Sequence, residues 1–172
     1  MTRNITLLVL SVLLPACATR TVPSQASPVP VTVLAGDPCT GPEPMLGNTE
    51  ESVVRRFGTP RAREMARLPN RHNPSIMDEL ITLRYDGAVV LLHTIPKYRS
   101  SFLSRLELTD PGFDVMPGLR VGMDRKAATA ALAMPEAGAR AVKECPLEVP
   151  PTIEATFEAQ LLVRIVWINE PD

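Results

Sequence analysis

The chain has 172 residues, of which 45% are hydrophobic and 22% charged, so it can bury the core of one ordinary domain or of two very small ones and is not disordered throughout. Its formal net charge of −1 gives no reason to expect nucleic-acid binding, because such binding requires a dense positive surface. The 18 prolines favour linkers and short elements over long helices.

The first 16 residues have the organisation of a secretory signal peptide. Arg3 supplies the positive start, Ile5 to Leu14 form an apolar run of ten residues, and the small residue Ala16 precedes Cys17. Ten residues are too few for a helix to cross a bilayer core of about 30 Å, which takes about 20. We therefore predict that residues 1–16 are a signal peptide that is removed.

The segment Leu14-Pro15-Ala16-Cys17 resembles the lipobox of bacterial lipoproteins. The resemblance implies that Cys17 carries fatty acyl chains such as palmitate, and several chains on one residue make a lasting anchor. The alternatives are an ordinary signal peptide cleaved elsewhere and an uncleaved anchor. By resemblance to lipoprotein sorting in Gram-negative bacteria, Ala18 implies the outer membrane, with the folded part in the periplasm. We assign the polar, Pro-rich residues 17–44 to a flexible, lipid-anchored tether.

Cys39 and Cys145 are the remaining cysteines. An even pair in an oxidising compartment makes a disulfide the leading hypothesis, and two separate buried thiols are the alternative. Neither cysteine has the spacing of a metal ligand, because no second Cys or His lies within a few residues.

Two segments of the chain repeat one another. Gly47 to Pro60 (GNTEESVVRRFGTP) and Gly122 to Pro135 (GMDRKAATAALAMP) both run from Gly to Pro, at a constant offset of 75 residues and without a gap. The repeat predicts an α+β fold of two tandem units, each a short helical segment packed on a small antiparallel β-sheet. We place the first unit at residues 45–112 and the second at 113–172.

Each repeat carries the signals of a short helix. In the first repeat, Asn48 or Thr49 can cap the helix, and Gly58 suits the left-handed position that follows the last turn. In the second, Asp124 is the expected cap. Ala133 stands where the first repeat has Gly58, so the end of the second helix is less well defined.

Strands are expected after each helix. Residues 80–95 hold two β-rich runs around Asp86-Gly87, a pair that favours a type I′ hairpin turn because both of its positions then have positive φ. A third strand is expected at 102–110. The corresponding region of the second unit is 152–168.

Several of these residues together resemble a known family. They are Gly47-Asn48-Thr49, Phe57-Gly58-Thr59-Pro60, the Tyr-centred hairpin and the stretch from Asp110 to Met123. They resemble the BamE-type (SmpA/OmlA) small outer-membrane lipoproteins and the related tandem β-lactamase-inhibitor-protein-like fold. The resemblance runs from residue 45 to the C-terminus, and it implies an α+β, non-enzymatic protein that binds other proteins in the cell envelope.

Few residues point to catalysis. His72 in a loop and His93 on a strand belong to no recognised metal or catalytic motif, and a packed or exposed strand position is the favoured interpretation of His93. Ser100, Ser101 and Ser104 lack a nucleophile-elbow pattern. We therefore predict no enzyme, no cofactor and no metal site, and keep an unrecognised hydrolase only as a third hypothesis.

Six arginines lie close together in the first unit. One interpretation is contact with an anionic membrane surface or an acidic partner, and the other is a solvated helix end and loop. Glu64 is the only acidic residue between the first and the last of them, which are Arg55, Arg56, Arg61, Arg63, Arg67 and Arg71.

The sequence thus predicts an outer-membrane-anchored periplasmic lipoprotein that acts as a non-enzymatic protein-binding module in envelope assembly or maintenance. Its partner would be an envelope protein of unknown identity, with membrane contact through the N-terminal lipid and no nucleic acid or small-molecule substrate. The alternative is a periplasmic inhibitor or immunity lipoprotein that blocks a specific enzyme.

Overall fold

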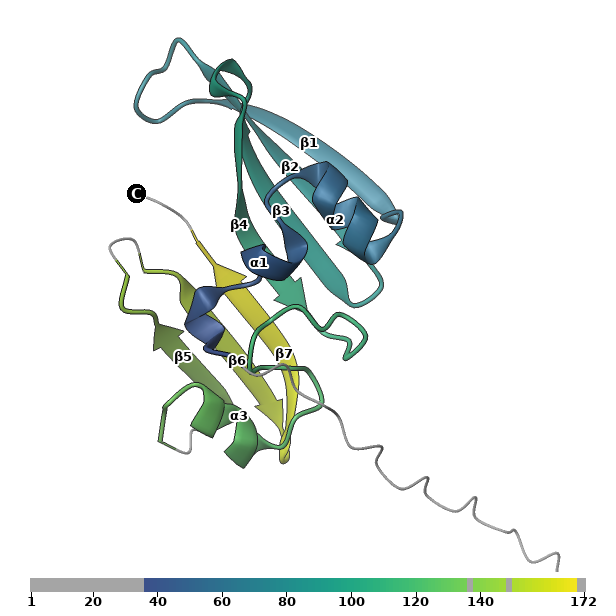
Figure 1. Ribbon diagram of the computed structural model, residues 1–172, viewed down its shortest axis with the longest axis vertical. Helices are drawn as coiled ribbons and strands as arrows, with labels where there is room; N and C mark the ends of the chain where they lie inside the picture. The colour runs from purple at the N-terminus through teal and green to yellow at the C-terminus, as the bar shows by residue number, and fades with distance from the viewer. Residues whose placement is uncertain (1–35, 136–137, 148–149, 170–172) are drawn as a thin grey trace, which may run out of the picture. The chain divides into compact units, whose positions relative to one another are not determined.

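A computed structural model describes residues 36–135, 138–147 and 150–169, all within the compact unit Thr32–Asp172. Seven strands form one sheet in the order β1-β2-β3-β4-β7-β6-β5, and every neighbouring pair is antiparallel (Figure 1). The strands are β1 (Ala62–Pro69), β2 (Met77–Tyr85), β3 (Ala88–Ile95), β4 (Ser100–Leu108), β5 (Arg140–Glu144), β6 (Thr152–Glu158) and β7 (Leu161–Ile168). The helices are α1 (Glu43–Leu46), α2 (Glu50–Phe57) and α3 (Arg125–Ala131), with 3-10 turns η1 (Pro38–Thr40) and η2 (Pro96–Tyr98).

The predicted α+β class is confirmed, but the strands do not form two small sheets. β4 pairs with β7 through four residue pairs, from Arg105 opposite Ile168 to Leu108 opposite Ile165. This pairing, which we call the seam, joins the strands that precede residue 110 to those that follow residue 140. A single antiparallel sheet therefore spans both predicted units.

The helices supply side chains to one face of this sheet. Strand residues such as Val90, Leu103 and Ile153 alternate onto that face and are fully buried, in one hydrophobic core with Val53 of α2 and Ala128 of α3. Successive strand residues point to opposite faces, so their neighbours lie on the other side of the sheet. We call that other side the free face, because no described helix packs its buried residues there.

Local capping accounts for the two longer helices. The Thr49 side chain accepts a hydrogen bond from the Ser52 backbone N–H (3.2 Å), and the Ser52 hydroxyl accepts one from the Thr49 N–H (3.1 Å), so Thr49 is the cap of α2. Asp124 caps α3 and accepts from the Lys126 N–H at 2.8 Å. Gly58 and Ala133, which follow these helices at the repeat offset, both have positive φ, at 83° and 51°.

The structure differs from the sequence-based predictions in two strands and in one turn. β1 and β5 were not predicted, and residues 62–69 are a strand where the sequence analysis placed a helix end and loop. The predicted hairpin at Asp86-Gly87 forms as β2 and β3, but only Gly87 has positive φ, so the turn is not type I′. The Asp86 backbone is compatible with an ordinary L-residue, and glycine alone supplies the left-handed position.

Residues 36–44, which the sequence analysis assigned to the tether, belong to the folded unit. Pro38 is buried in η1, and Gly41 lies so close to the Trp167 indole that a Cβ would meet the ring at 3.1 Å. The earlier part of the predicted tether and the predicted signal peptide lie outside the described residues. Within the described part, none of the helices has the length and hydrophobicity of a membrane span.

The two positive-φ positions yield a matched pair of substitutions. Nothing lies within 4 Å of a Cβ added at Gly58, so the cost of Gly58→Ala is conformational, and we expect it to lower the free energy of unfolding by about 1–3 kcal/mol. Ala133→Gly relieves a left-handed alanine and should raise it by about 0.5–1 kcal/mol, after the entropy cost of glycine. Urea unfolding followed by circular dichroism measures both, and effects of the same sign would contradict this account.

An ion pair across the seam yields a pH prediction. The Arg164 guanidinium donates to the Glu107 carboxylate at 2.7 Å and lowers the pKa of Glu107 against the opposing effect of partial burial. The pKa is lower in the folded chain than in the unfolded one, so the pair stabilises the fold above about pH 4.3 and loses this effect as pH falls through the folded pKa. In Arg164→Met, stability should therefore fall less steeply on acidification.

The control for that prediction is Arg84→Met. Arg84 pairs with Glu64 at 3.0 Å between β2 and β1, where both side chains are at least half exposed. Exposed pairs contribute about 0–1 kcal/mol, so this variant should keep the acid dependence of the unmodified protein. Equal slopes for the unmodified protein and Arg164→Met between pH 2 and 5 would contradict the assignment to Glu107.

Candidate functional site

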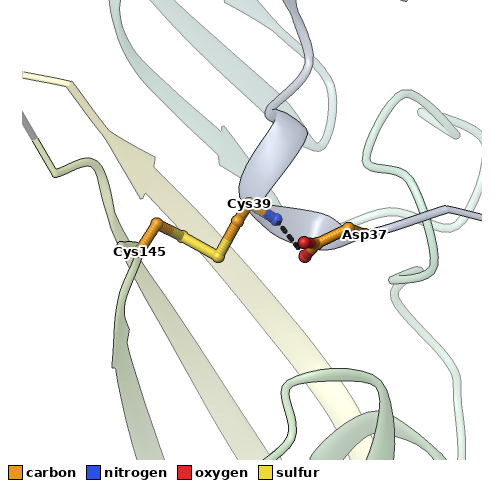
Figure 2. The surroundings of a disulfide bond; sticks show 3 residues. All are labelled: Asp37, Cys39 and Cys145. Atoms are coloured by element: carbon orange, nitrogen blue, oxygen red, sulfur yellow. Dashed lines mark hydrogen bonds between the residues drawn. A yellow bond between two sulfur atoms is a disulfide. The ribbon is translucent and has the colours of Figure 1, made fainter. Parts of the chain in front are cut away.

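The predicted disulfide is confirmed. Cys39 of η1 and Cys145, the residue after β5, are bonded with their Cα atoms 5.4 Å apart (Figure 2). The Asp37 carboxylate accepts a hydrogen bond from the Cys39 backbone N–H at 2.9 Å and so fixes the turn that presents the sulfur. The bond ties the N-terminal part of the folded unit to an edge of the sheet. Cys17, the predicted lipidation site, lies outside the described residues.

The predicted arginine cluster is largely balanced by carboxylates from elsewhere in the chain. Arg63 binds Glu50 of α2 through two nitrogens at 2.6 and 3.0 Å, and Arg67 binds Glu79 of β2 at 2.8 Å. The strand neighbour supplies acids that are remote in the sequence, while Glu64 pairs with Arg84 instead. Three further arginines of the set have contacts as well, namely Arg55 with Glu51 (2.7 Å), Arg61 with Asp86, and Arg56 with the Asp114 carbonyl oxygen (3.3 Å). The cluster is therefore not a uniformly basic patch.

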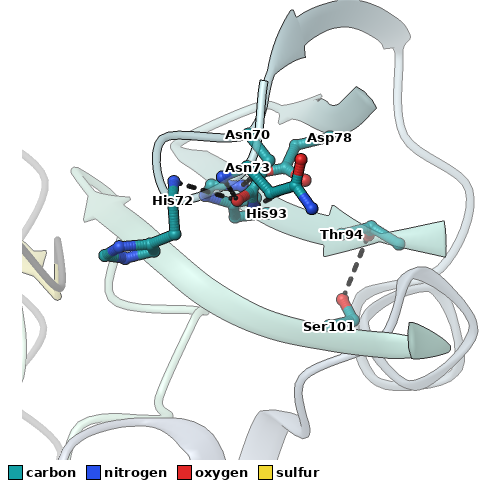
Figure 3. Close-up of polar contacts among 7 residues, drawn as sticks. All are labelled: Asn70, His72, Asn73, Asp78, His93, Thr94 and Ser101. Atoms are coloured by element: carbon teal, nitrogen blue, oxygen red, sulfur yellow. Dashed lines mark hydrogen bonds and ion pairs between the residues drawn. The ribbon is translucent and has the colours of Figure 1, made fainter. Parts of the chain in front are cut away.

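A cavity at one end of the sheet brings together polar residues from three elements. Its volume is about 250 Å³, and it lies beside the β1–β2 loop at the ends of β3 and β4. Asn70, Asp78 and His93 form its polar part (Figure 3). Leu68, Ile95 and Phe102 form its apolar part. Arg71 and His72 border it, and the His72 ring points away from Asp78 and His93.

A buried carboxylate organises the polar part of this cavity. The Asp78 side chain is only 2% exposed, and it accepts a hydrogen bond from His93 Nε2 at 2.8 Å. The Asn70 amide donates to both Asp78 oxygens, at 2.8 and 3.1 Å. Nε2 is the ring nitrogen engaged in this pair, and Nδ1 is the second polar atom of the His93 ring.

Asn70 also holds the loop that covers Asp78. Its side-chain oxygen accepts from the backbone N–H groups of His72 and Asn73, each at 3.0 Å. The same residue thus binds the loop on one side and the carboxylate on the other. The Phe102 ring lies against the His93 ring with centroids 4.7 Å apart, which fixes the imidazole from the neighbouring strand. The polar groups of the cavity are therefore held in one arrangement.

The composition of this cavity suits binding. An Asp–His pair occurs in general-base catalysis, where the histidine contacts a nucleophile. Here the hydroxyl of Ser101 forms its hydrogen bond with Thr94, at 3.2 Å, and Phe102 covers His93. The described residues hold no cluster of three or more His, Cys, Asp or Glu that could bind a metal ion. What the cavity offers is an apolar recess with a fixed polar base.

Both histidines lie on the predicted elements, His72 in a loop and His93 on a strand, whereas Asp78 and Asn70 were not among the predicted site residues. A usable signal for Asp78 was present, because the turn at residues 86–87 sets Leu80 opposite His93. In that register Asp78 falls one diagonal step from His93 on the same face. Asn70 carried no such signal, since its role depends on the folded path of the β1–β2 loop.

In comparisons with protein-family models, curated proteins and solved structures, nothing matches this chain. The resemblance to BamE-type lipoproteins and to the tandem inhibitor-like fold therefore stays a prediction.

Removal of the buried carboxylate tests the organisation of the cavity. Asp78→Ala leaves the Asn70 amide without its acceptor in a buried site, so we expect the free energy of unfolding to fall by about 1–3 kcal/mol. Ser101→Ala at the same end of the sheet removes one neutral hydrogen bond and should cost at most about 1 kcal/mol. Urea titration distinguishes the two variants, and equal losses would mean that Asp78 is not the organising group.

Proposed function

We propose that the protein is an outer-membrane-anchored periplasmic lipoprotein that works as a non-enzymatic protein-binding module in envelope assembly or maintenance. The observation that carries the binding role is the free face of the seven-stranded sheet. Leu80, Val89 and Leu91 lie on it with intermediate exposure, at adjacent positions of β2 and β3. An apolar centre with polar surroundings is the usual composition of a protein interface.

The charges on the free face support recognition of a specific partner. Arg164 and Glu107 pair across the seam, and Arg140 pairs with Glu154 at 2.6 Å on β5 and β6. Paired charges around an apolar centre fix orientation more than they add affinity. The face therefore combines a docking area with groups that reject wrong partners.

The proposed compartment is supported by the sequence of the N-terminus and by the disulfide. The lipobox-like Leu14-Pro15-Ala16-Cys17 favours an acylated Cys17. Disulfides persist in oxidising compartments such as the periplasm, and Cys39 and Cys145 are bonded. Both features fit the same location.

We also propose that the chain consists of two tandem units fused through one sheet. A helix precedes three or four strands twice along the chain, and the strand order is mirrored about the seam. The offset of 75 residues relates the caps Thr49 and Asp124 and the positive-φ residues Gly58 and Ala133. These correspondences support a duplication of a smaller helix-plus-sheet unit.

The same free face supports a second candidate, an inhibitor or immunity lipoprotein that blocks one enzyme. A broad, covalently braced sheet suits the rigid surface that tight inhibitors present, because little freedom is lost on binding. The two candidates differ in the identity of the partner.

Acylation of Cys17 and protein contact through the free face can both be tested in intact cells. Mass spectrometry of the N-terminal peptide should find acyl chains on Cys17, and Cys17→Ser should release the protein from the outer membrane. A photo-crosslinking residue at Leu91 or Thr82, on the free face, should give a discrete protein adduct, whereas the same residue at Glu51 or Ala127, on the helices, should not.

The adducts decide between the two candidates. Envelope-assembly proteins in the Leu91 adduct favour the first, and a single hydrolase or toxin favours the second. An unacylated, intact leader, or adducts that do not distinguish Leu91 from Glu51, would overturn the proposed function.

A further inference from the structure

We propose that the cavity at the end of the sheet is the anchor pocket for one apolar or aromatic side chain from an acidic segment of the protein partner. The proposal rests on the proposed function and names the chemistry that the partner presents. It combines the cavity volume, its lining, the charge of the two loops beside it and an exposed Tyr in one of these loops.

The volume of the cavity selects the size of its occupant. Pockets that enclose small-molecule ligands measure about 300–1,000 Å³. The cavity, at about 250 Å³, lies below this range and suits a single side chain. Leu68, Ile95 and Phe102 provide apolar contact for that side chain.

The base of the cavity is already ordered. Asp78 and Asn70 are both buried, and their hydrogen bonds hold the loop and the His93 ring in place. A partner that enters therefore does not have to order these groups, which lowers the entropy cost of binding. The His93 ring adds one polar atom, so a side chain with a polar tip, such as Tyr, is accepted as well as a purely apolar one.

The loops beside the cavity are cationic. Residues 70–76 (NRHNPSI) contain Arg71 and His72, residues 95–101 (IPKYRSS) contain Lys97 and Arg99, and neither segment contains an acid. Both loops lie at the same end of the sheet, beyond the last pairs of β1 with β2 and of β3 with β4 (Figure 1).

Two carboxylates of β2 beside the cavity are engaged within the fold. Asp78 is bound by Asn70 and His93, and Glu79 is bound by Arg67. Lys97 and Arg99 are exposed in the second loop, and charge complementarity with these two cations favours an acidic partner segment.

An exposed aromatic residue lies in the second loop beside the cavity. Tyr98 is 61% exposed and belongs to η2. Tyr is enriched at the energetic centres of interfaces. A cationic surface with an exposed Tyr also attracts anionic lipid, but a lipid surface has no side chain to fill a recess, so the cavity favours a peptide.

The experiment is a selection of random twelve-residue peptides on the purified full chain, followed by fluorescence anisotropy of labelled peptides. We expect enrichment of acidic peptides that contain one Phe, Tyr, Leu or Ile. Replacement of that residue by Gly in the peptide should weaken binding at least tenfold. In the protein, Ile95→Trp fills the cavity, and the double variant Lys97→Glu with Arg99→Glu reverses the charge of the loop. Each should weaken binding of the selected peptide at least tenfold.

The matched control is the double variant Arg55→Glu with Arg56→Glu. It makes the same change in charge on α2, on the helix-covered side, and should keep peptide affinity within twofold. Circular dichroism identifies any variant that fails to fold. The Lys97 and Arg99 side chains are exposed, so their double variant is expected to fold. It therefore tests the proposal even if Ile95→Trp does not fold.

Each remaining outcome overturns the proposal. Failure to enrich any peptide, enrichment of basic peptides, or equal binding by Ile95→Trp would do so. Binding to phosphatidylglycerol vesicles that is lost in the Lys97 and Arg99 double variant, without any selected peptide, would assign this end of the sheet to a lipid surface. If no peptide binds but the Leu91 crosslinking residue still gives protein adducts, the proposed function stands with a different docking site. If the Leu91 crosslinking residue gives no adduct in a protein without further changes, the proposed function itself is overturned.

Discussion

The pairing of β4 with β7 is the constraint on which the rest of this fold depends. At the seam Leu106 lies opposite Trp167, and both are buried in the core that all three helices share. Trp167 also closes against Gly41, so the same contact positions the N-terminal turns. Without the seam each half would be a sheet of three or four strands under one short helix, which buries little apolar surface. The seam also makes the free face continuous across the sheet.

The elements that the sequence predicted well are those whose signals are local. Thr49, Gly58 and Asp124 act within one helical turn, and each occupies its expected position. β1 was missed because it is an edge strand with nearly every side chain exposed, so its sequence AREMARLP shows no alternation of apolar and polar residues. β4 and β7 were anticipated as strands, but their partnership depends on how two distant segments pack, which no local pattern encodes.

The candidate site shows the same division between local and distant information. The register of the β2–β3 hairpin follows from its turn, so the proximity of Asp78 and His93 was within reach of the sequence. The balance of charge in the arginine cluster could not be predicted from the sequence, because the acids come from other parts of the chain that fold against β1. These acids are Glu50, Glu79 and Asp86. Charges counted along a chain overstate a basic patch wherever a neighbouring strand carries the opposite sign. Lys97 and Arg99, which are exposed in the loop between β3 and β4, are the cations on which the charge of this end of the sheet depends.

The disulfide has a mechanical consequence for a chain held at its N-terminus. Cys39 lies only a few residues into the described fold, and its bond leads directly to Cys145 at the end of β5. Tension applied ahead of Gly36 would pass through sulfur into the sheet edge, bypassing the short helices that follow. Those helices would carry no load, and the peptide links between residues 39 and 145 would form a closed ring that cannot be drawn out from that end. A protein tethered in this way would resist unfolding by a force applied at its N-terminus, and the strand pairing that forms its free face would be kept.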